Sequence, residues 1–122
     1  RNSTKTRQRM ARLSLSQNEF KILAVLSSGE QKHGYGILKL INDAAPVERK
    51  ILIGSLYNTL KGMEKKGFVE SVWAERDAND HKPQRRYYKI TGLGERVYRE
   101  DEEVLVSIWL KTQNPILKKF AH

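Results

Sequence analysis

Cysteine is absent from the 122 residues of this chain. Its absence excludes disulfide bonds, cysteine nucleophiles and thiolate metal sites together. Long apolar runs are also missing, since no stretch approaches the roughly 20 apolar residues that a membrane-spanning helix needs. The first residues lack the apolar segment of a signal peptide. We therefore expect a cytoplasmic protein with no membrane partner.

Patterns that carry catalysis or metal binding are missing as well. The sequence contains no paired metal ligands at a useful spacing, no glycine-rich phosphate loop and no nucleophile set beside a base. Ser55 has no nearby histidine, and His33 stands alone before an expected helix, where a histidine usually caps or packs. We therefore predict that the protein is not an enzyme and that it needs neither a metal nor a cofactor.

Acidic residues are scarce relative to basic ones. Lysine and arginine number 23 against 14 aspartates and glutamates, which gives a net charge of +9. A surplus of this size on a chain of single-domain length predicts a polyanionic partner, with nucleic acid ahead of an anionic membrane. Residues 1–13 contribute basic side chains and no acidic one. We interpret them as a flexible basic arm that either follows phosphates or only aids solubility.

Two helices are expected after this arm. Residues 16–19 read Ser-Gln-Asn-Glu, the form of a capping box, in which serine and glutamate each bond the other's backbone N–H. The helix that follows is apolar on most sides and ends at residues 27–29. A second helix begins near residues 33–35 and ends before Pro46, since a residue before proline avoids the helical region. Its expected core-facing stripe is Ile37, Leu40, Ile41 and Ala44.

The third expected helix, residues 53–66, has two different faces and ends at Gly67. One face is an apolar stripe formed by Ile53, Leu56, Leu60 and Met63. Small residues on the other face allow close approach, an asparagine can read an adenine edge, and lysines seek phosphate or guanine. We interpret the segment as a DNA-recognition helix, although alone it also fits an ordinary amphipathic helix. The outer face consists of Gly54, Ser55, Asn58, Lys61, Gly62 and Lys65.

After Gly67 the periodicity changes from helical to alternating. Residues 68–73 and 85–90 are rich in aromatic and β-branched side chains, and the polar, turn-rich residues 76–84 separate them, which predicts a hairpin with a long loop. Lys82, Arg85 and Arg86 place positive charge near the loop. Because adjacent residues of a strand face opposite ways, only one of the two arginines can face DNA. The other should pair with an acid or cover apolar surface.

One more helix is expected to begin at Thr91 and to end before Asn114-Pro115. Its apolar residues fall on two neighbouring seams, which suits packing against a second copy. Folding back on its own domain is the alternative. The residues expected in a dimer interface are Val97, Val104, Leu105, Ile108 and Trp109.

The order of these elements predicts a mainly α protein with a small β-hairpin, an α+β fold of the winged helix-turn-helix type. We expect a flexible arm at residues 1–13, a winged helix-turn-helix domain at 14–90, a dimerisation helix at 91–113 and a tail at 114–122. The residues expected at DNA are Gly54, Ser55, Tyr57, Asn58, Lys61, Lys65, Lys82, Arg85 and Arg86.

Between about residues 15 and 108 the chain resembles the PadR family of bacterial transcriptional regulators. The similar pieces are His-Gly-Tyr at 33–35, Gly-Ser-Leu-Tyr at 54–57, Glu-Lys-Lys-Gly-Phe-Val-Glu-Ser at 64–71 and Arg-Arg-Tyr-Tyr-Lys-Ile-Thr at 85–91. Each piece is common alone, but four in this order and spacing are specific. Two departures stand out: Ile53 replaces the proline that often precedes the Gly-Ser-Leu-Tyr piece, and the basic arm is longer than usual.

The resemblance implies a homodimeric repressor joined through the last helix and bound to a palindromic operator in double-stranded DNA. It also implies relief of repression by a small planar aromatic effector near the dimer interface. By position Trp109 is the candidate contact for such an effector, and plain interface packing is the alternative. A different class of function stays open: a winged-helix module whose basic surface meets an acidic protein and that has no specific operator.

Overall fold

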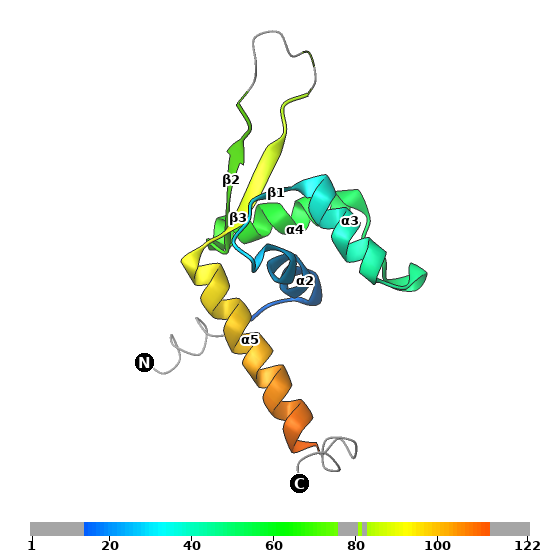
Figure 1. The fold of residues 1–122 in the computed structure, drawn as a ribbon, viewed down its shortest axis with the longest axis vertical. Helices are drawn as coiled ribbons and strands as arrows, with labels where there is room; N and C mark the ends of the chain where they lie inside the picture. Colours follow the sequence, from blue (N-terminus) through cyan, green and yellow to red (C-terminus); the bar gives the residue numbers. More distant parts are fainter. Residues whose placement is uncertain (1–13, 76–80, 82, 113–122) are drawn as a thin grey trace.

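The computed structural model describes residues 14–75, 81 and 83–112 of the chain. The helices α2, α3 and α4 form a compact group, the sheet rises on one side of them, and α5 extends away in the opposite direction (Figure 1). The elements are α2 (Gln17–Leu26), β1 (Lys32–His33), α3 (Gly34–Ala44), η1 (Val47–Arg49), α4 (Ile53–Lys66), β2 (Val69–Trp73), β3 (Arg86–Ile90) and α5 (Gly92–Lys111). The α+β fold class is thus confirmed. None of the helices in these ranges is both long and apolar enough to cross a membrane.

The sheet has three antiparallel strands in the order β1-β3-β2. Strands β2 and β3 form the expected hairpin, paired from Val69 with Ile90 to Trp73 with Arg86. The two-residue strand β1 adds to the other edge of β3, where Lys32 pairs with Tyr88. The predicted hairpin is therefore confirmed, and the sequence analysis missed the third strand β1. So short a strand has no periodicity of its own and exists because β3 offers it hydrogen bonds.

Local capping signals are confirmed at every described helix where they were expected. The Ser16 hydroxyl oxygen accepts from the Glu19 amide at 3.2 Å, and the Glu19 carboxylate accepts from the Ser16 amide at 2.9 Å. His33 caps α3, because its Nδ1 accepts from the Gly36 amide at 2.9 Å. Thr91 caps α5. Helix α4 ends at Gly67 with φ of 82°, a left-handed conformation that glycine adopts without strain.

The core lies where α2, α3 and α4 meet the sheet. Ile53, Leu40 and Ala44 are exposed, so their predicted places in core-facing stripes are wrong. On α3 the core covers only the narrower stripe of Ile37 and Ile41, and Ile53 is the first residue of α4. The buried hydrophobic residues are Ile22, Leu23, Leu26, Ile37, Ile41, Ile51, Leu56, Leu60, Met63, Phe68, Val69, Tyr88, Ile90 and Val97.

An ion pair ties α2 to the end of α4. Glu19 is only 6% exposed, and its carboxylate accepts from the Lys66 ammonium at 2.8 Å. Burial alone would raise the pKa of the Glu19 carboxyl, but hydrogen bonds from Lys66 and from the Ser16 backbone outweigh it and lower the pKa below its ordinary value of 4.5. The Lys66 ammonium is therefore engaged by an acid of its own domain, although both Lys66 and its neighbour Lys65 are exposed.

Helix α5 has a packed first half and an unpacked second half. Val97 is 3% exposed within the core, so the prediction that it would need a partner chain to cover it is wrong. Its position on an apolar seam serves its own domain instead. From Val104 onward all the apolar side chains of the helix are about half exposed. The predicted end at Asn114-Pro115 lies outside the described residues, in which the helix ends at Lys111.

Candidate nucleic-acid interface

The outer face of α4 is free of contacts with the core. Asn58, Lys61 and Lys65 are all exposed and lie one turn apart along the helix. Gly54 and Ser55, at the start of the helix, are also exposed. Leu56, Leu60 and Met63 hold the opposite face of α4 in the core, which fixes the direction of the outer face. The helix therefore presents an amide and two ammonium groups to a partner on a rigid support.

A groove separates this outer face from the sheet. It has a volume of about 580 Å³, and its walls are side chains of α4 and β3. The groove contains one acidic residue, Glu64, whose charge is offset by Arg86 at 3.0 Å. The groove is lined by Tyr57, Asn58, Lys61, Glu64, Lys65, Arg86 and Tyr88.

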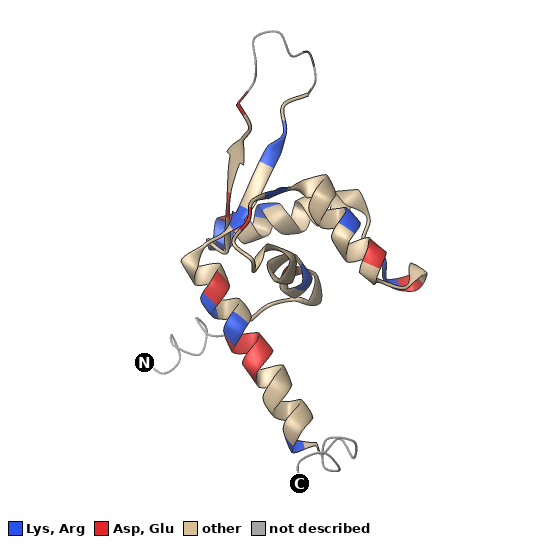
Figure 2. Cartoon of the chain, in the orientation of Figure 1, with Lys and Arg blue, Asp and Glu red and all other residues tan. Residues whose placement is uncertain are grey.

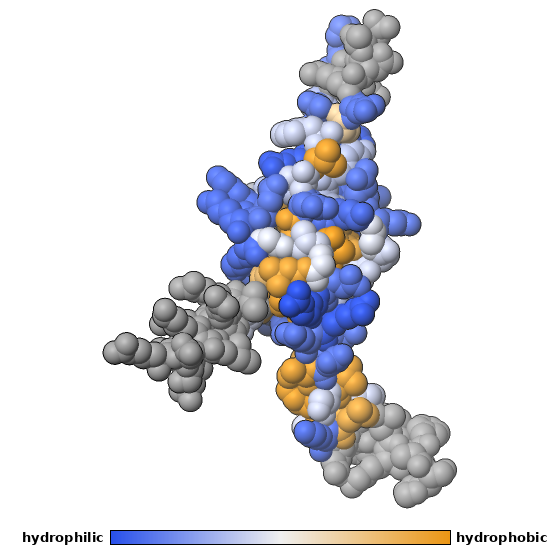
Figure 3. All heavy atoms as spheres, turned by 90° about the vertical axis from the view of Figure 1, so that its left-hand side faces the viewer, coloured by the Kyte–Doolittle hydropathy of each residue, from blue (hydrophilic) through white to orange (hydrophobic). Residues whose placement is uncertain are grey.

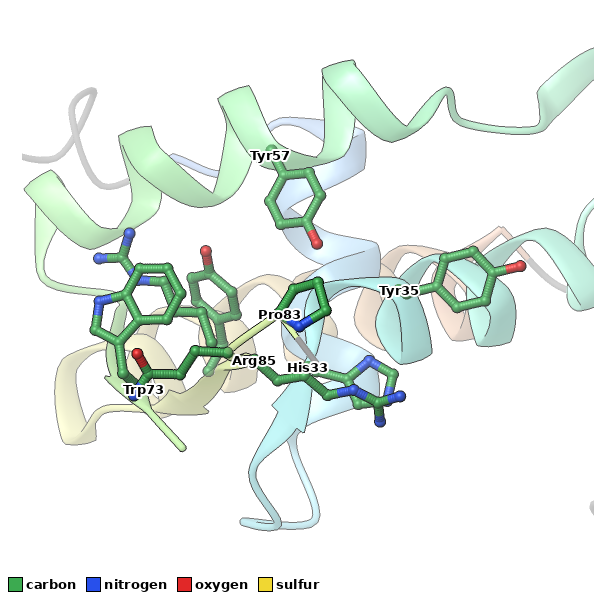
Figure 4. Close-up of a pocket in the computed structure, with 9 residues that line it drawn as sticks. His33, Tyr35, Tyr57, Trp73, Pro83 and Arg85 are labelled. Carbon is green, nitrogen blue, oxygen red and sulfur yellow. The ribbon is translucent and has the colours of Figure 1, made fainter. Parts of the chain in front are cut away.

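A second hollow of about 610 Å³ adjoins the groove at Tyr57 and lies between the start of α3, α4 and the root of the wing. The wing is here the loop end of the hairpin formed by β2 and β3, and its root is the Trp73–Arg86 pair. In Figure 4 Tyr57 points from α4 into this hollow, with Trp73 on one side and Tyr35 on the other. Tyr57 packs directly on the start of α3, because a Cβ at Gly34 would lie 2.6 Å from its ring. Tyr35 and Trp73 were not among the predicted site residues, although both belong to, or follow, pieces of the family pattern.

The two arginines at the root of the wing have different environments. Arg85 is exposed and lines the hollow. Arg86 donates to both carboxylate oxygens of Glu64, at 3.1 and 3.0 Å, and from Nε to the Ser71 hydroxyl at 2.9 Å. The expectation that one of the pair would bind an acid is thus confirmed. The Arg86 guanidinium is engaged within the protein, which leaves Arg85 as the exposed arginine of the pair.

Charge is distributed unevenly over the fold (Figure 2). Helix α4 and strand β3 carry most of the lysines and arginines near the groove, whereas the acidic residues of α5 form a separate band halfway along that helix. Lys82 and residues 1–13, which the sequence assigned to a basic surface, lie outside the described residues. No cluster of metal-ligating side chains occurs among residues 14–75, 81 and 83–112.

The chain has three helices followed by a hairpin, and the short strand β1, which precedes the second helix, pairs with the free edge of that hairpin. This arrangement defines a winged helix-turn-helix protein. The family model of the transcriptional regulator PadR-like family matches residues 22–100, more than half of the chain. The chain therefore belongs to the PadR-like family of transcriptional regulators. It is a DNA-binding regulator and not an enzyme.

Solved structures agree with this membership. A PadR-like transcription factor from Bacteroides fragilis is 25% identical with a TM-score of 0.65, over 93% of this chain and 98% of that chain. A PadR-like transcriptional regulator from Bacillus cereus is 26% identical with a TM-score of 0.62, over 80% and 89%. A PadR family regulator from Clostridium difficile shares the fold, with 22% identity and a TM-score of 0.67 over 84% and 99%. Comparison with curated proteins gave no match.

Proposed function

We propose that the protein is a homodimeric repressor that binds a palindromic operator, with α4 in the major groove and the wing beside it. The observation that carries this proposal is the exposed, small and cationic outer face of α4. Its acidic neighbour Glu64 is neutralised by Arg86, so the groove offers no free negative charge to a phosphate. Gly54 and Ser55 at the start of α4 leave room for the DNA backbone.

Base reading and phosphate binding fall to different residues in this proposal. Asn58 lies halfway along the outer face, where its amide can donate to and accept from an adenine edge. Lys61 and Lys65 follow on the same face and suit guanine or phosphate. Tyr57 and Arg85 lie beside the wing root, between the two grooves that the helix and the wing would enter, so their partners are phosphates. Tyr57 and Arg85 thus set the position of the helix on the DNA, and Asn58 reads the base sequence.

The dimer forms through the second half of α5. This part of the helix extends beyond the domain, and Figure 3 shows apolar side chains gathered toward its end. Val104, Val106 and Leu110 are exposed together with three further apolar residues of the same segment, a larger apolar patch than most monomers leave in water. A second copy of α5 would cover Leu105, Ile108 and Trp109 at the same time.

Relief of repression would follow from a planar aromatic effector bound at this dimer interface. Trp109 is 48% exposed, and an indole ring offers a flat apolar surface on which such a compound can stack. Its neighbours on α5 are aliphatic, which suits an apolar effector. Binding there would alter the spacing between two copies of α4 and hence the fit to a palindrome.

The experiment that tests the repressor proposal is a salt series with two duplexes. One carries the DNA upstream of the protein's own gene, and the other has a random sequence of equal length. Tighter binding to the first by about 10³ or more at moderate salt is the expected result for a sequence-specific regulator. Equal affinities for both duplexes, together with tight binding to an acidic protein, would favour the protein-interaction module instead.

A further inference from the structure

We propose that Glu64 and Arg86 form a positioning pair that fixes the wing relative to the recognition helix α4, and that this pair sets operator affinity without touching DNA. The inference rests on the proposed operator binding and deepens it. Glu64 belongs to α4 and Arg86 to β3, and the two are joined by hydrogen bonds of 3.1 and 3.0 Å. Both bonds come from Arg86 Nη2, and the bond from Nε to Ser71 engages a second nitrogen, so the guanidinium plane has a defined orientation and the contact transmits geometry as well as charge.

The pair closes a network among three elements. Ser71 on β2 donates from its hydroxyl to Glu64 and accepts from Arg86 Nε at 2.9 Å. The Arg86 guanidinium also lies 5.5 Å from the centre of the Trp73 ring and 5.8 Å from that of Tyr88, so the sheet holds it by cation–π contacts. Arg86 thereby joins β3, the later strand of the hairpin, to the last turn of α4, just before the turn at Gly67 that connects the helix to β2 in sequence.

The location of the pair matches a positioning role. Arg86 faces Trp73 in the last paired position of the hairpin, where the wing leaves the body of the domain. A small rotation at this root is amplified along the wing, and the helix and the wing would have to enter neighbouring grooves of one duplex. Loss of the ion pair should therefore disturb their relative placement more than the stability of the core, which the Leu60 side of α4 maintains.

A direct role for Arg86 at phosphate makes the opposite predictions. Its charge is already satisfied by Glu64, whose carboxylate lines the groove beside Lys61. Removing Glu64 would release Arg86 toward DNA and would remove a negative charge. If Arg86 contacts phosphate, the Glu64 variant should therefore bind DNA more tightly than the wild type. If the pair positions the wing, the same variant should bind the operator less tightly than the wild type, although the change in charge favours DNA binding.

The test uses Glu64→Gln, Arg86→Gln and the variant that carries both changes. Glu70→Gln is the control. Glu70 is an exposed acid on the same hairpin outside the network, so its variant matches the charge change of Glu64→Gln. The probes are a duplex selected by the wild-type protein from a random library and a random duplex of equal length. We expect each single variant to bind the selected duplex about tenfold more weakly, or about 1.4 kcal/mol, and the double variant to be no weaker than either. Glu64→Gln should bind random DNA at least as tightly as the wild type.

A second measurement needs no DNA. With Trp109→Phe in the background, Trp73 is the sole tryptophan, since the chain has two. Quenching of Trp73 by acrylamide should rise in Glu64→Gln and Arg86→Gln and stay at the wild-type level in Glu70→Gln. Unchanged quenching in the two network variants would overturn the proposal.

Two DNA results would also overturn it. One is tighter operator binding by Glu64→Gln, and the other is a salt slope for Arg86→Gln that is shallower by about one unit, the sign of a lost phosphate contact. If the wild-type protein selects no duplex, the proposed operator binding fails, while the quenching measurement still decides on the pair.

Discussion

Glutamate at positions 104 and 108 should convert the protein from a dimer to a monomer. Val104 and Ile108 are 56% and 53% exposed at the unpacked end of α5. Burying a whole aliphatic side chain of this size is worth roughly 1.5–3 kcal/mol, so burying the exposed half contributes about 1 kcal/mol per side chain. Two side chains in each of two copies then amount to about 4 kcal/mol, before the cost of desolvating four carboxylates is added.

That loss raises the dissociation constant of the dimer by about a thousandfold, because each 1.4 kcal/mol is a factor of ten. A loss of this size should leave monomers at micromolar concentration.

Sedimentation velocity at micromolar concentration measures this directly. The matched control is Val47→Glu with Leu52→Glu, two exposed apolar residues outside α5 that undergo the same chemical change. The control should sediment as the wild type does. A wild-type protein that is monomeric at this concentration, or equal dissociation of both double variants, would refute the reasoning.

Three further changes have definite outcomes. Glu19→Gln should destabilise the fold by about 1–2 kcal/mol at pH 7, since it weakens the charged hydrogen bond to Lys66. The lowered pKa of Glu19 means that its contribution is full above the ordinary value of 4.5 and is lost as pH falls through the folded-state pKa, so denaturation curves of variant and wild type should converge in acid. Gly94→Ala should cost about 2–4 kcal/mol, because its Cβ would collide with the backbone carbonyl of Phe68, and a melting temperature within a degree of wild type would contradict this. Trp109→Ala should weaken the binding of planar aromatic dyes about tenfold or more in a fluorescence titration, whereas equal affinity in both proteins would remove Trp109 from an effector site.

Local signals in the sequence predicted most of the helix boundaries. The capping box at Ser16 and the glycine at position 67 act within one turn of the helix, so the residues alone determine their effect. The strand β1 was out of reach for the opposite reason. Lys32 and His33 become a strand only because β3 lies beside them, which is a tertiary fact.

Periodicity assigned the buried residues at the centre of each stripe correctly, but it could not say where the core ends or what covers a seam. The seam that contains Val97 and Val104 is continuous in sequence, yet Val97 is buried in its own domain and Val104 lies beyond it. The same limit applies to the wing root. Alternation predicted that one of Arg85 and Arg86 would turn inward, and only the position of Glu64 on a different element decided that it is Arg86.

The hollow beside the wing is a product of three elements that meet in space. Tyr35 and Trp73 are far apart in the sequence and have no shared spacing that would mark them as neighbours. The nearest sequence signal was the family pattern, in which Gly34 leaves the room that Tyr57 occupies. That Gly34 makes room for the Tyr57 ring can be recognised only when the positions of both residues in the fold are known.

The central claim is that α4 reads bases, and the affinity of Asn58→Ala for operator and for random DNA tests it most directly. Arg85→Ala, which removes the exposed arginine at the wing root, is the comparison, and both variants are measured across a salt series. Loss of a base contact by Asn58→Ala should cost about 1–3 kcal/mol on the operator and little on random DNA. Arg85→Ala should weaken both duplexes about equally and make the log–log salt slope shallower by roughly one unit. Equal weakening of operator and random DNA by Asn58→Ala would contradict base reading by this helix.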